Sequence, residues 1–202
     1  DEIKEALILS SRSLVEAEPN YTYATSRILL DGLRTEALSF LEIAPNATHA
    51  EMEKLYPKTL KTYIKKAIEL ELINPELGKM DLEKLGESLN PNRDLMFSYL
   101  GLQTLYDRYF IHKDEVRFEL PQIFFMRVAM GLAIGEESRE DRAIEFYNLL
   151  SSFDYMSSTP TLFNSGTIHS QLSSCYLTTV PDDLKGIYDA LGDNAMLSKW
   201  AG

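Results

Sequence analysis

Cys175 is the only cysteine in this 202-residue chain, and it lies in a stretch rich in hydroxyl side chains. Residues 157–166 read SSTPTLFNSG and residues 171–178 read QLSSCYLT. Hydroxyls and backbone amides at a Gly or Pro turn suit hydrogen bonding to phosphate or sugar oxygens, and a thiol on an adjoining strand suits redox chemistry. A surface loop beside a buried, inert thiol has the same composition. Composition alone leaves both interpretations open.

The composition excludes several other classes of protein. A net charge of −11 argues against broad binding to nucleic acid, which requires clustered Lys and Arg. No apolar run approaches the ~20 residues that span a bilayer, and the first residues do not resemble a signal peptide. The three histidines lie apart, without acidic or thiol partners at ligand spacing, so no metal site is predicted. One cysteine excludes a disulfide within the chain and favours a cytoplasmic protein.

Helical periodicity runs from the start of the chain to about residue 153. Apolar residues at three- and four-residue spacing predict a helix over about 50–72. A strongly apolar segment predicts a helix over 121–133 that is buried on most sides. Between these helices, residues 90–94 are predicted to form a polar turn, and residues 116–120 a small hairpin or extended arm.

The pattern changes after Phe153. Ser, Thr, Pro, Asn and Gly surround short β-prone runs such as residues 175–180, which predict a strand. Helical spacing returns at Pro181 and continues to Trp200. Because the chain begins without methionine and ends just past a helix, we expect a fragment of a larger protein.

Four motifs make the chain recognisable. They appear in the order and approximate spacing of one family, the large catalytic subunits of aerobic class I ribonucleoside-diphosphate reductases, which the sequence closely resembles. They are NRDLMFSY at 92–99, PQIFFMRVAMG at 121–131, STPTLFNSG at 158–166 and LSSCYL at 172–177.

The resemblance implies a mainly α fold made of parts of three domains. Residues 1–42 would be the C-terminal helices of an ATP-cone, an allosteric nucleotide-binding module. Residues 43–153 would be the helical N-terminal domain of the large subunit. Residues 154–202 would be the first strand and first helix of the ten-stranded α/β barrel that carries catalysis.

The resemblance also implies roles for individual residues. Cys175 matches one thiol of the redox pair that reduces the ribose 2′ carbon and ends as a disulfide. Thr161, Ser174 and Gly202 match positions that contact the nucleoside diphosphate substrate, together with Cys175 itself.

A second group of residues matches an effector site. Asp182, Asp183 and Leu184 correspond to the start of the segment that holds a deoxynucleotide effector at a dimer interface. An Asp there could accept hydrogen bonds from a sugar hydroxyl. Simple capping of the following helix by the two Asp residues is compatible with that role.

The implied partners follow from the family. They are a ribonucleoside diphosphate substrate, a second large subunit, a metal-containing small subunit that supplies the radical, and thioredoxin or glutaredoxin as reductant. ATP, dATP and deoxynucleoside triphosphates are the implied effectors, and no metal or cofactor is expected within this chain. The radical-forming cysteine and the other redox cysteines are not in these 202 residues, so the chain by itself is expected to be inactive.

Two other interpretations stay open. A helical interaction or scaffold module would have the same helical content, with residues 157–180 as a connector. An adenosylcobalamin-dependent reductase of the same superfamily would share the barrel and the redox cysteine, although the helical motifs resemble the class I enzymes more closely.

Overall fold

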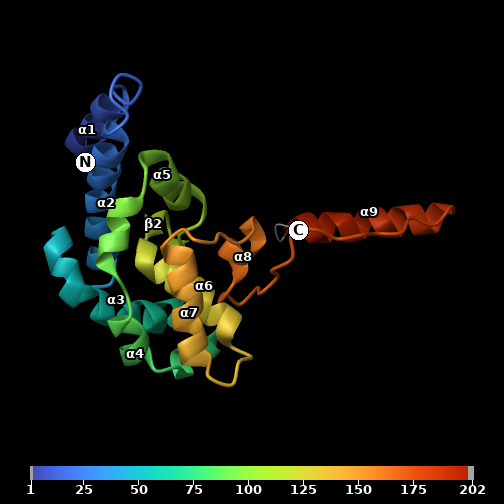
Figure 1. Ribbon diagram of the computed structural model, residues 1–202. Coiled ribbons are helices and arrows are strands. Elements are labelled where there is room, and N and C mark those ends of the chain that lie inside the picture. The colour runs from blue at the N-terminus through green and yellow to red at the C-terminus, as the bar shows by residue number, and fades with distance from the viewer. Residues whose placement is uncertain (1, 200–202) are drawn as a thin grey trace.

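Helices form most of residues 2–199, the part of the chain that the computed structural model describes (Figure 1). The α-helices are α1 (Glu2–Arg12), α2 (Tyr21–Phe40), α3 (His49–Glu69), α4 (Leu82–Glu87), α5 (Tyr99–Arg108), α6 (Pro121–Ala133), α7 (Arg139–Ser151), α8 (Thr159–Asn164) and α9 (Leu184–Lys199). The 3₁₀ helices η1 (Pro75–Lys79) and η2 (Pro91–Met96) and the strands β1 (His112–Lys113) and β2 (Val116–Arg117) complete the described elements.

Helix α6 is the centre of the core, and its position follows from its composition. Pro121 occupies its first turn after an extended Leu120, an arrangement that starts a helix without wasting a backbone donor. Every residue from Pro121 to Met130 is buried, as expected of a helix that is apolar on all sides. Helix α7 packs along α6, and the two lie side by side in Figure 1. The predicted helix over 121–133 is confirmed.

Helix α3 begins with a capping box and ends with a reversal of the chain. The backbone N–H and the hydroxyl of Thr48 both donate to the Glu51 carboxylate at 2.7 Å. After Glu69 the chain turns through Glu71 at a φ of 57°, and the Leu72 N–H donates to the Ala67 carbonyl at 3.0 Å. The helix predicted over about 50–72 is therefore present. It ends at Glu69, and the chain reversal at Glu71 takes the place of its expected last turn.

The predicted hairpin is also present, while the predicted polar turn differs from expectation. Strands β1 and β2 pair antiparallel, with His112 opposite Arg117. Residues 90–94 instead enter the 3₁₀ helix η2, in which the Asn90 side chain accepts from the Asn92 N–H at 3.0 Å. Asp94 is only 1% exposed, so this end of the stretch is buried, whereas Asn92 remains exposed.

The strand expected at residues 175–180 is not formed. These residues are extended and exposed, and among residues 2–199 the only named strands are β1 and β2. A strand is defined by hydrogen bonds to a neighbouring strand, and within residues 2–199 no strand pairs with this segment. The short helix α8 lies in the region after Phe153, where the sequence pattern predicts no helix. The mainly α fold is confirmed, and the barrel strand is the part that the structure corrects.

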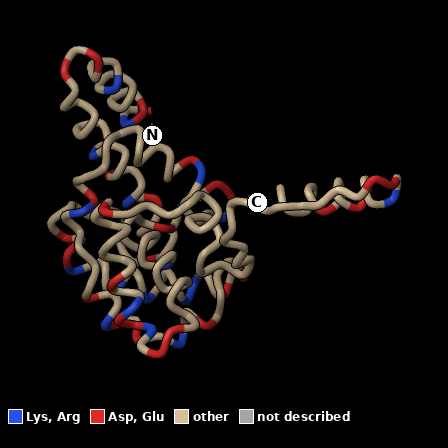
Figure 2. The backbone as a smooth tube through the Cα atoms, turned by 45° about the vertical axis from the view of Figure 1, so that its right-hand side comes forward, with Lys and Arg blue, Asp and Glu red and all other residues tan. Residues whose placement is uncertain are grey.

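Helix α9 projects from the helical body (Figure 1). The extended chain that precedes α9 runs outward beside this helix. Residues 171 and 176–179 line a shared groove with Asp193, Met196 and Leu197. Acidic and basic residues are interspersed over the body in Figure 2, and the projection stands clear of it in that view as well. Over the described range, the structure has no helix that is both long enough and apolar enough to cross a membrane.

We predict opposite effects of two glycine-to-alanine changes inside helices. A Cβ at Gly131 would lie 2.1 Å from the backbone nitrogen of Gly166, so Gly131→Ala should lower the free energy of unfolding by at least about 1–3 kcal/mol. A Cβ at Gly32 in α2 would meet nothing within 4 Å, so Gly32→Ala should raise it by about 0.5–1 kcal/mol. Urea denaturation followed by circular dichroism measures both. Equal effects of the two changes would contradict the close approach of α6 to Gly166.

Candidate functional site

Thr161 lies in α8, and its side chain ties that helix to the segment that leads to Cys175. The Thr161 hydroxyl donates to the Leu172 carbonyl at 3.1 Å. The Asn164 side-chain amide, on the same helix, donates to the Gln171 carbonyl at 2.7 Å. The structure therefore brings together two of the motifs that the sequence analysis singled out.

Ser174 and Cys175 follow directly and are exposed. The Ser174 hydroxyl lies 3.7 Å from the Cys175 sulfur. Leu177 is fully exposed as well, so the thiol has no apolar cover from that side chain. The interpretation of Cys175 as a buried small hydrophobe is wrong, and its thiol is accessible for exchange with another thiol or a disulfide.

The residues predicted to bind effector lie elsewhere. Asp182, Asp183 and Leu184 are exposed at the start of α9, the end of that helix that lies away from the body (Figure 1). The Asp183 carboxylate accepts from the Gly186 N–H at 2.9 Å, so its capping role is confirmed. The structure does not bring this group close to Thr161. Gly202, the remaining predicted site residue, lies outside the described residues.

A hollow of about 500 Å³ opens beside Thr161. Its lining is mostly apolar and comes from α6, α7 and the start of α8, with the hydroxyls of Ser157, Ser158 and Thr161 among it. The Tyr109 ring stacks on Phe163 of α8 with centroids 4.4 Å apart. Helix α8 is thus held by packing as well as by hydrogen bonds, and an open apolar surface adjoins its hydroxyl groups.

Arg127 holds the end of α8, and the sequence analysis missed it. Its guanidinium is fully buried and donates from Nε to Glu119 Oε1 at 2.7 Å and from Nη1 to the Ser165 carbonyl at 2.7 Å. Tyr63 donates its hydroxyl to the same Glu119 oxygen at 2.5 Å. Burial by itself would lower the pKa of Arg127, but the Glu119 charge and the Tyr63 hydroxyl hold it above its usual range. Arg127 therefore keeps its charge although it is fully buried.

The sequence does contain a signal for this anchor. Arg127 is the one charged residue in a largely apolar helical run, and Glu119 lies two residues before the proline that starts this helix. A charge at a position that the periodicity buries requires a partner of opposite sign. Which residue is that partner cannot be deduced from periodicity.

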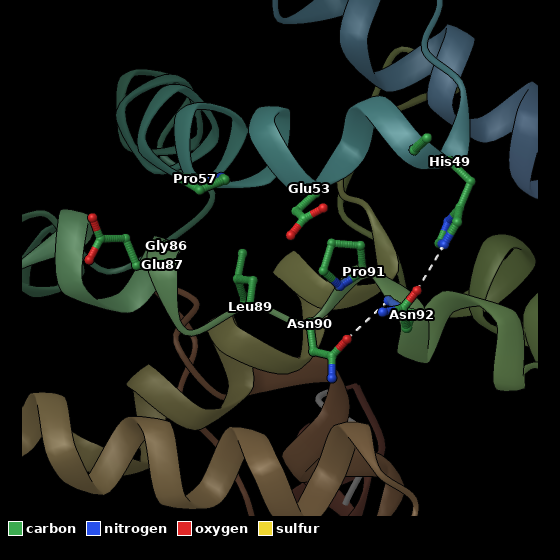
Figure 3. A pocket seen from close by; sticks show the side chains of 10 residues that line it. His49, Glu53, Pro57, Gly86, Glu87, Leu89, Asn90, Pro91 and Asn92 are labelled. Atoms are coloured by element: carbon green, nitrogen blue, oxygen red, sulfur yellow. Dashed lines mark hydrogen bonds between the residues drawn. The ribbon is translucent and has the colours of Figure 1, made fainter.

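A larger hollow, about 710 Å³, lies between α3, α4 and η2 (Figure 3). Glu53 points into it from α3, opposite Leu89 and Pro91. At one end His49 Nε2 lies 3.3 Å from Asn92 Oδ1. None of the predicted site residues lines this hollow, so its size does not mark the predicted chemistry, and we assign the candidate site to α8 and the segment after it.

Asp94 belongs to the same η2 helix but is buried. Its two oxygens accept from the Tyr56 hydroxyl at 2.7 Å and from the Gln122 amide at 2.8 Å. Burial raises the pKa of Asp94 from 3.8 to about 6, although these donors and the nearby charge of Arg34 lower it. Among residues 2–199, no group of three or more His, Cys, Asp or Glu side chains could hold a metal ion.

Comparisons with known proteins identify relatives of this chain. The family model described as ribonucleotide reductase, all-alpha domain, matches residues 95–170. The chain is 50% identical over 202 residues to the ribonucleoside-diphosphate reductase subunit alpha of Chlamydia muridarum, which covers the whole chain and 19% of that protein. It is 37% identical over 206 residues to the subunit of the same name from Helicobacter pylori, again over the whole chain and 24% of the relative.

A viral relative extends the similarity. The ribonucleoside-diphosphate reductase large subunit of Variola virus is 35% identical over 181 residues, which is 82% of this chain and 22% of the relative. The chain belongs to the ribonucleotide reductase large-subunit family. It spans about a fifth of the length of the curated relatives that it matches.

The buried carboxyl of Asp94 predicts a pH dependence of stability. Its folded pKa, about 6, lies above the ordinary value of 3.8, so its contribution is present in full below pH 3.8 and is lost as the pH rises to about 6. A shift of this size corresponds to about 3 kcal/mol. The free energy of unfolding of the native chain, measured relative to Asp94→Asn, should therefore fall between about pH 4 and pH 6. Urea titrations at several pH values test this, and parallel profiles would contradict it.

Proposed function

We propose that this chain is part of a ribonucleoside-diphosphate reductase large subunit, which converts ribonucleoside diphosphates to 2′-deoxyribonucleoside diphosphates for DNA synthesis. One observation carries the proposal: Thr161 on α8 is hydrogen bonded to the segment that leads to an exposed thiol, Cys175. Similarity over the whole chain to reductase alpha subunits supports it.

The proposed reaction needs two thiols. Two cysteine S–H groups supply two electrons and two hydrogens, the ribose 2′ hydroxyl leaves as water, a hydrogen takes its place, and the sulfurs become a disulfide. Cys175 is one of these thiols, and the other lies outside the 202 residues, which contain a single cysteine. Thioredoxin or glutaredoxin would return the pair to thiols. A metal-containing small subunit would supply the radical that starts the reaction.

In this proposal Thr161, Ser174 and Gly202 contact the substrate. Hydroxyl groups suit that task because they both donate and accept hydrogen bonds to sugar and phosphate oxygens. Asp182, Asp183 and Leu184 would bind a deoxynucleoside triphosphate effector where two large subunits meet. The exposed apolar side chains of α9, among them Leu184 and Leu191, support a contact surface there.

We also propose the domain assignment implied by the motifs. Residues 1–42 would end an ATP-cone that responds to ATP and dATP, residues 43–153 would form the helical domain, and residues 154–202 would begin the barrel. Helices α1 and α2 pack on each other and Lys4 pairs with Asp31 at 2.9 Å, while α2 also packs on α5 and its buried leucines join the core of the following helices. The proposed boundary near residue 42 therefore rests on the motifs.

Two alternatives have less support. A scaffold module gives no reason for an exposed thiol beside hydroxyl groups, whereas a redox site does. A cobalamin-dependent reductase would not need a radical-supplying subunit, and the relatives are named as alpha or large subunits, which implies a second kind of subunit in those enzymes.

Replacement of the thiol tests the proposed reaction. In the full-length protein, Cys175→Ser should abolish turnover of a ribonucleoside diphosphate with a protein dithiol as reductant, because serine cannot form the disulfide. Effector binding, measured by equilibrium dialysis, should be retained. Thr178→Ser, an exposed hydroxyl-conserving change in the same segment, serves as the control and should turn over normally. Normal turnover by Cys175→Ser would refute the assignment.

The two aspartates before α9 should separate capping from effector binding. Asp183→Asn keeps an oxygen for the Gly186 N–H and should leave the helix intact. Asp182→Ala removes a carboxylate that makes none of the described capping hydrogen bonds. We expect it to weaken binding of a deoxynucleoside triphosphate by about tenfold, or about 1.4 kcal/mol, in equilibrium dialysis. Unchanged binding would exclude Asp182 from the effector site.

A further inference from the structure

Arg127 connects the buried core to the proposed substrate segment. Toward the core it makes two hydrogen bonds to Glu119, from Nε to Oε1 at 2.7 Å and from Nη2 to Oε2 at 3.2 Å. Toward the surface its Nη1 donates to the Ser165 carbonyl at 2.7 Å and lies 3.4 Å from the Leu162 carbonyl. The acceptors on this second side are carbonyls at the C-terminal end of α8, which lack partners within so short a helix.

Other contacts fix the same turn against α6. The Ser165 hydroxyl donates to the Val128 carbonyl at 2.7 Å. The Asn74 N–H donates to the Gly166 carbonyl at 2.9 Å. Gly166 has a φ of 76°, and it packs on the Arg127 backbone so closely that a Cβ would lie 2.7 Å from the Arg127 carbonyl oxygen. The end of α8 therefore has one position relative to α6.

Helix α8 in turn fixes the start of the segment that carries the thiol. Thr161 and Asn164 are both in α8, and they hold the carbonyls of Leu172 and Gln171 respectively. Ser174 and Cys175 follow within three residues. A continuous series of hydrogen bonds thus runs from Glu119 through Arg127 and α8 to the start of this segment.

Stability alone does not require an ion pair at this place. Replacing a buried pair with apolar residues of similar volume is often neutral or stabilising, since each charge must be removed from water. What an arginine adds is a rigid planar fork that directs several donors at fixed angles. Here the fork meets a carboxylate on one side and helix-end carbonyls on the other, so it fixes geometry in a way that an apolar side chain cannot.

We propose that Arg127 is a positioning residue for substrate binding, acting through the carbonyls at the end of α8 on Thr161 and on the segment with Ser174 and Cys175. This inference rests on the proposed function, because it assumes that these residues meet a ribonucleoside diphosphate. Arg127 itself is fully buried and touches no substrate. Its effect is on where the contacting groups lie.

The test removes the ion pair without leaving a lone buried charge. In the full-length reductase, the double variant Glu119→Gln, Arg127→Met keeps an amide that can accept from the Ile111 N–H and donate to Tyr63. We expect the KM and the Kd for a ribonucleoside diphosphate to rise about tenfold or more, which corresponds to about 1.4 kcal/mol. Effector affinity should stay within about twofold of wild type.

The readout separates positioning from loss of folded protein. A smaller folded fraction lowers the apparent kcat and leaves KM unchanged, whereas displaced contacts raise KM and Kd. Arg142→Met is the matched control, since Arg142 on α7 pairs with Glu145 at 2.7 Å but is half exposed and does not touch α8. This variant should behave as wild type.

A second variant keeps the inference testable if the double variant does not fold. Arg127→Lys retains the charge and the Glu119 pair but loses the fork, so KM should still rise. Wild-type KM in either folded variant would overturn the positioning role. Absence of substrate binding by the wild-type full-length protein would instead overturn the proposed function, so the two failures are distinguishable.

Discussion

The buried ion pair between Glu119 and Arg127 is the constraint on which the rest of the structure depends. Two charges in a dry core are tolerated only if every donor and acceptor is satisfied. Here Glu119 also accepts the Tyr63 hydroxyl from α3 and the Ile111 N–H from the chain before the hairpin, while Arg127 reaches the end of α8. Any relative shift of these elements would leave a charge without partners. The pair therefore selects one arrangement of the elements around α6 among those that bury the same apolar area.

Periodicity and composition predict the elements much better than they predict this arrangement. The helix over Pro121–Ala133 follows from an apolar run that starts with proline, and α3 follows from the regular spacing of its apolar residues. Burial of Asp94 and the partner of Arg127 do not follow, because both depend on residues distant in sequence. A polar stretch such as 90–94 predicts a solvated turn unless it is known that Tyr56 and Gln122 lie within reach.

Only part of the candidate site could be predicted from the sequence, because its parts are held by different kinds of interaction. Thr161 and the segment before Cys175 come together through side-chain hydrogen bonds to backbone carbonyls, which short-range motifs encode well. The strand expected at 175–180 is absent because a β-ladder needs a second strand, and β-prone residues alone do not form one. For the same reason Leu177 is exposed instead of lying on the face of a sheet.

The two proposed nucleotide sites differ in how firmly the described residues hold them. Thr161 is fixed through α8 to a buried charge, whereas Asp182 and Leu184 lie at the outer end of α9 and are exposed. The chain between them is extended and pairs with no strand. A movement at one end therefore has little effect on the other end through this segment alone. If the two proposed sites communicate, the link would have to run through the apolar side chains of α9, which the helical body does not cover. Under the proposed function, the anchored α8 would keep the substrate side in place, and the uncovered helix α9 would be the part that responds to a bound effector.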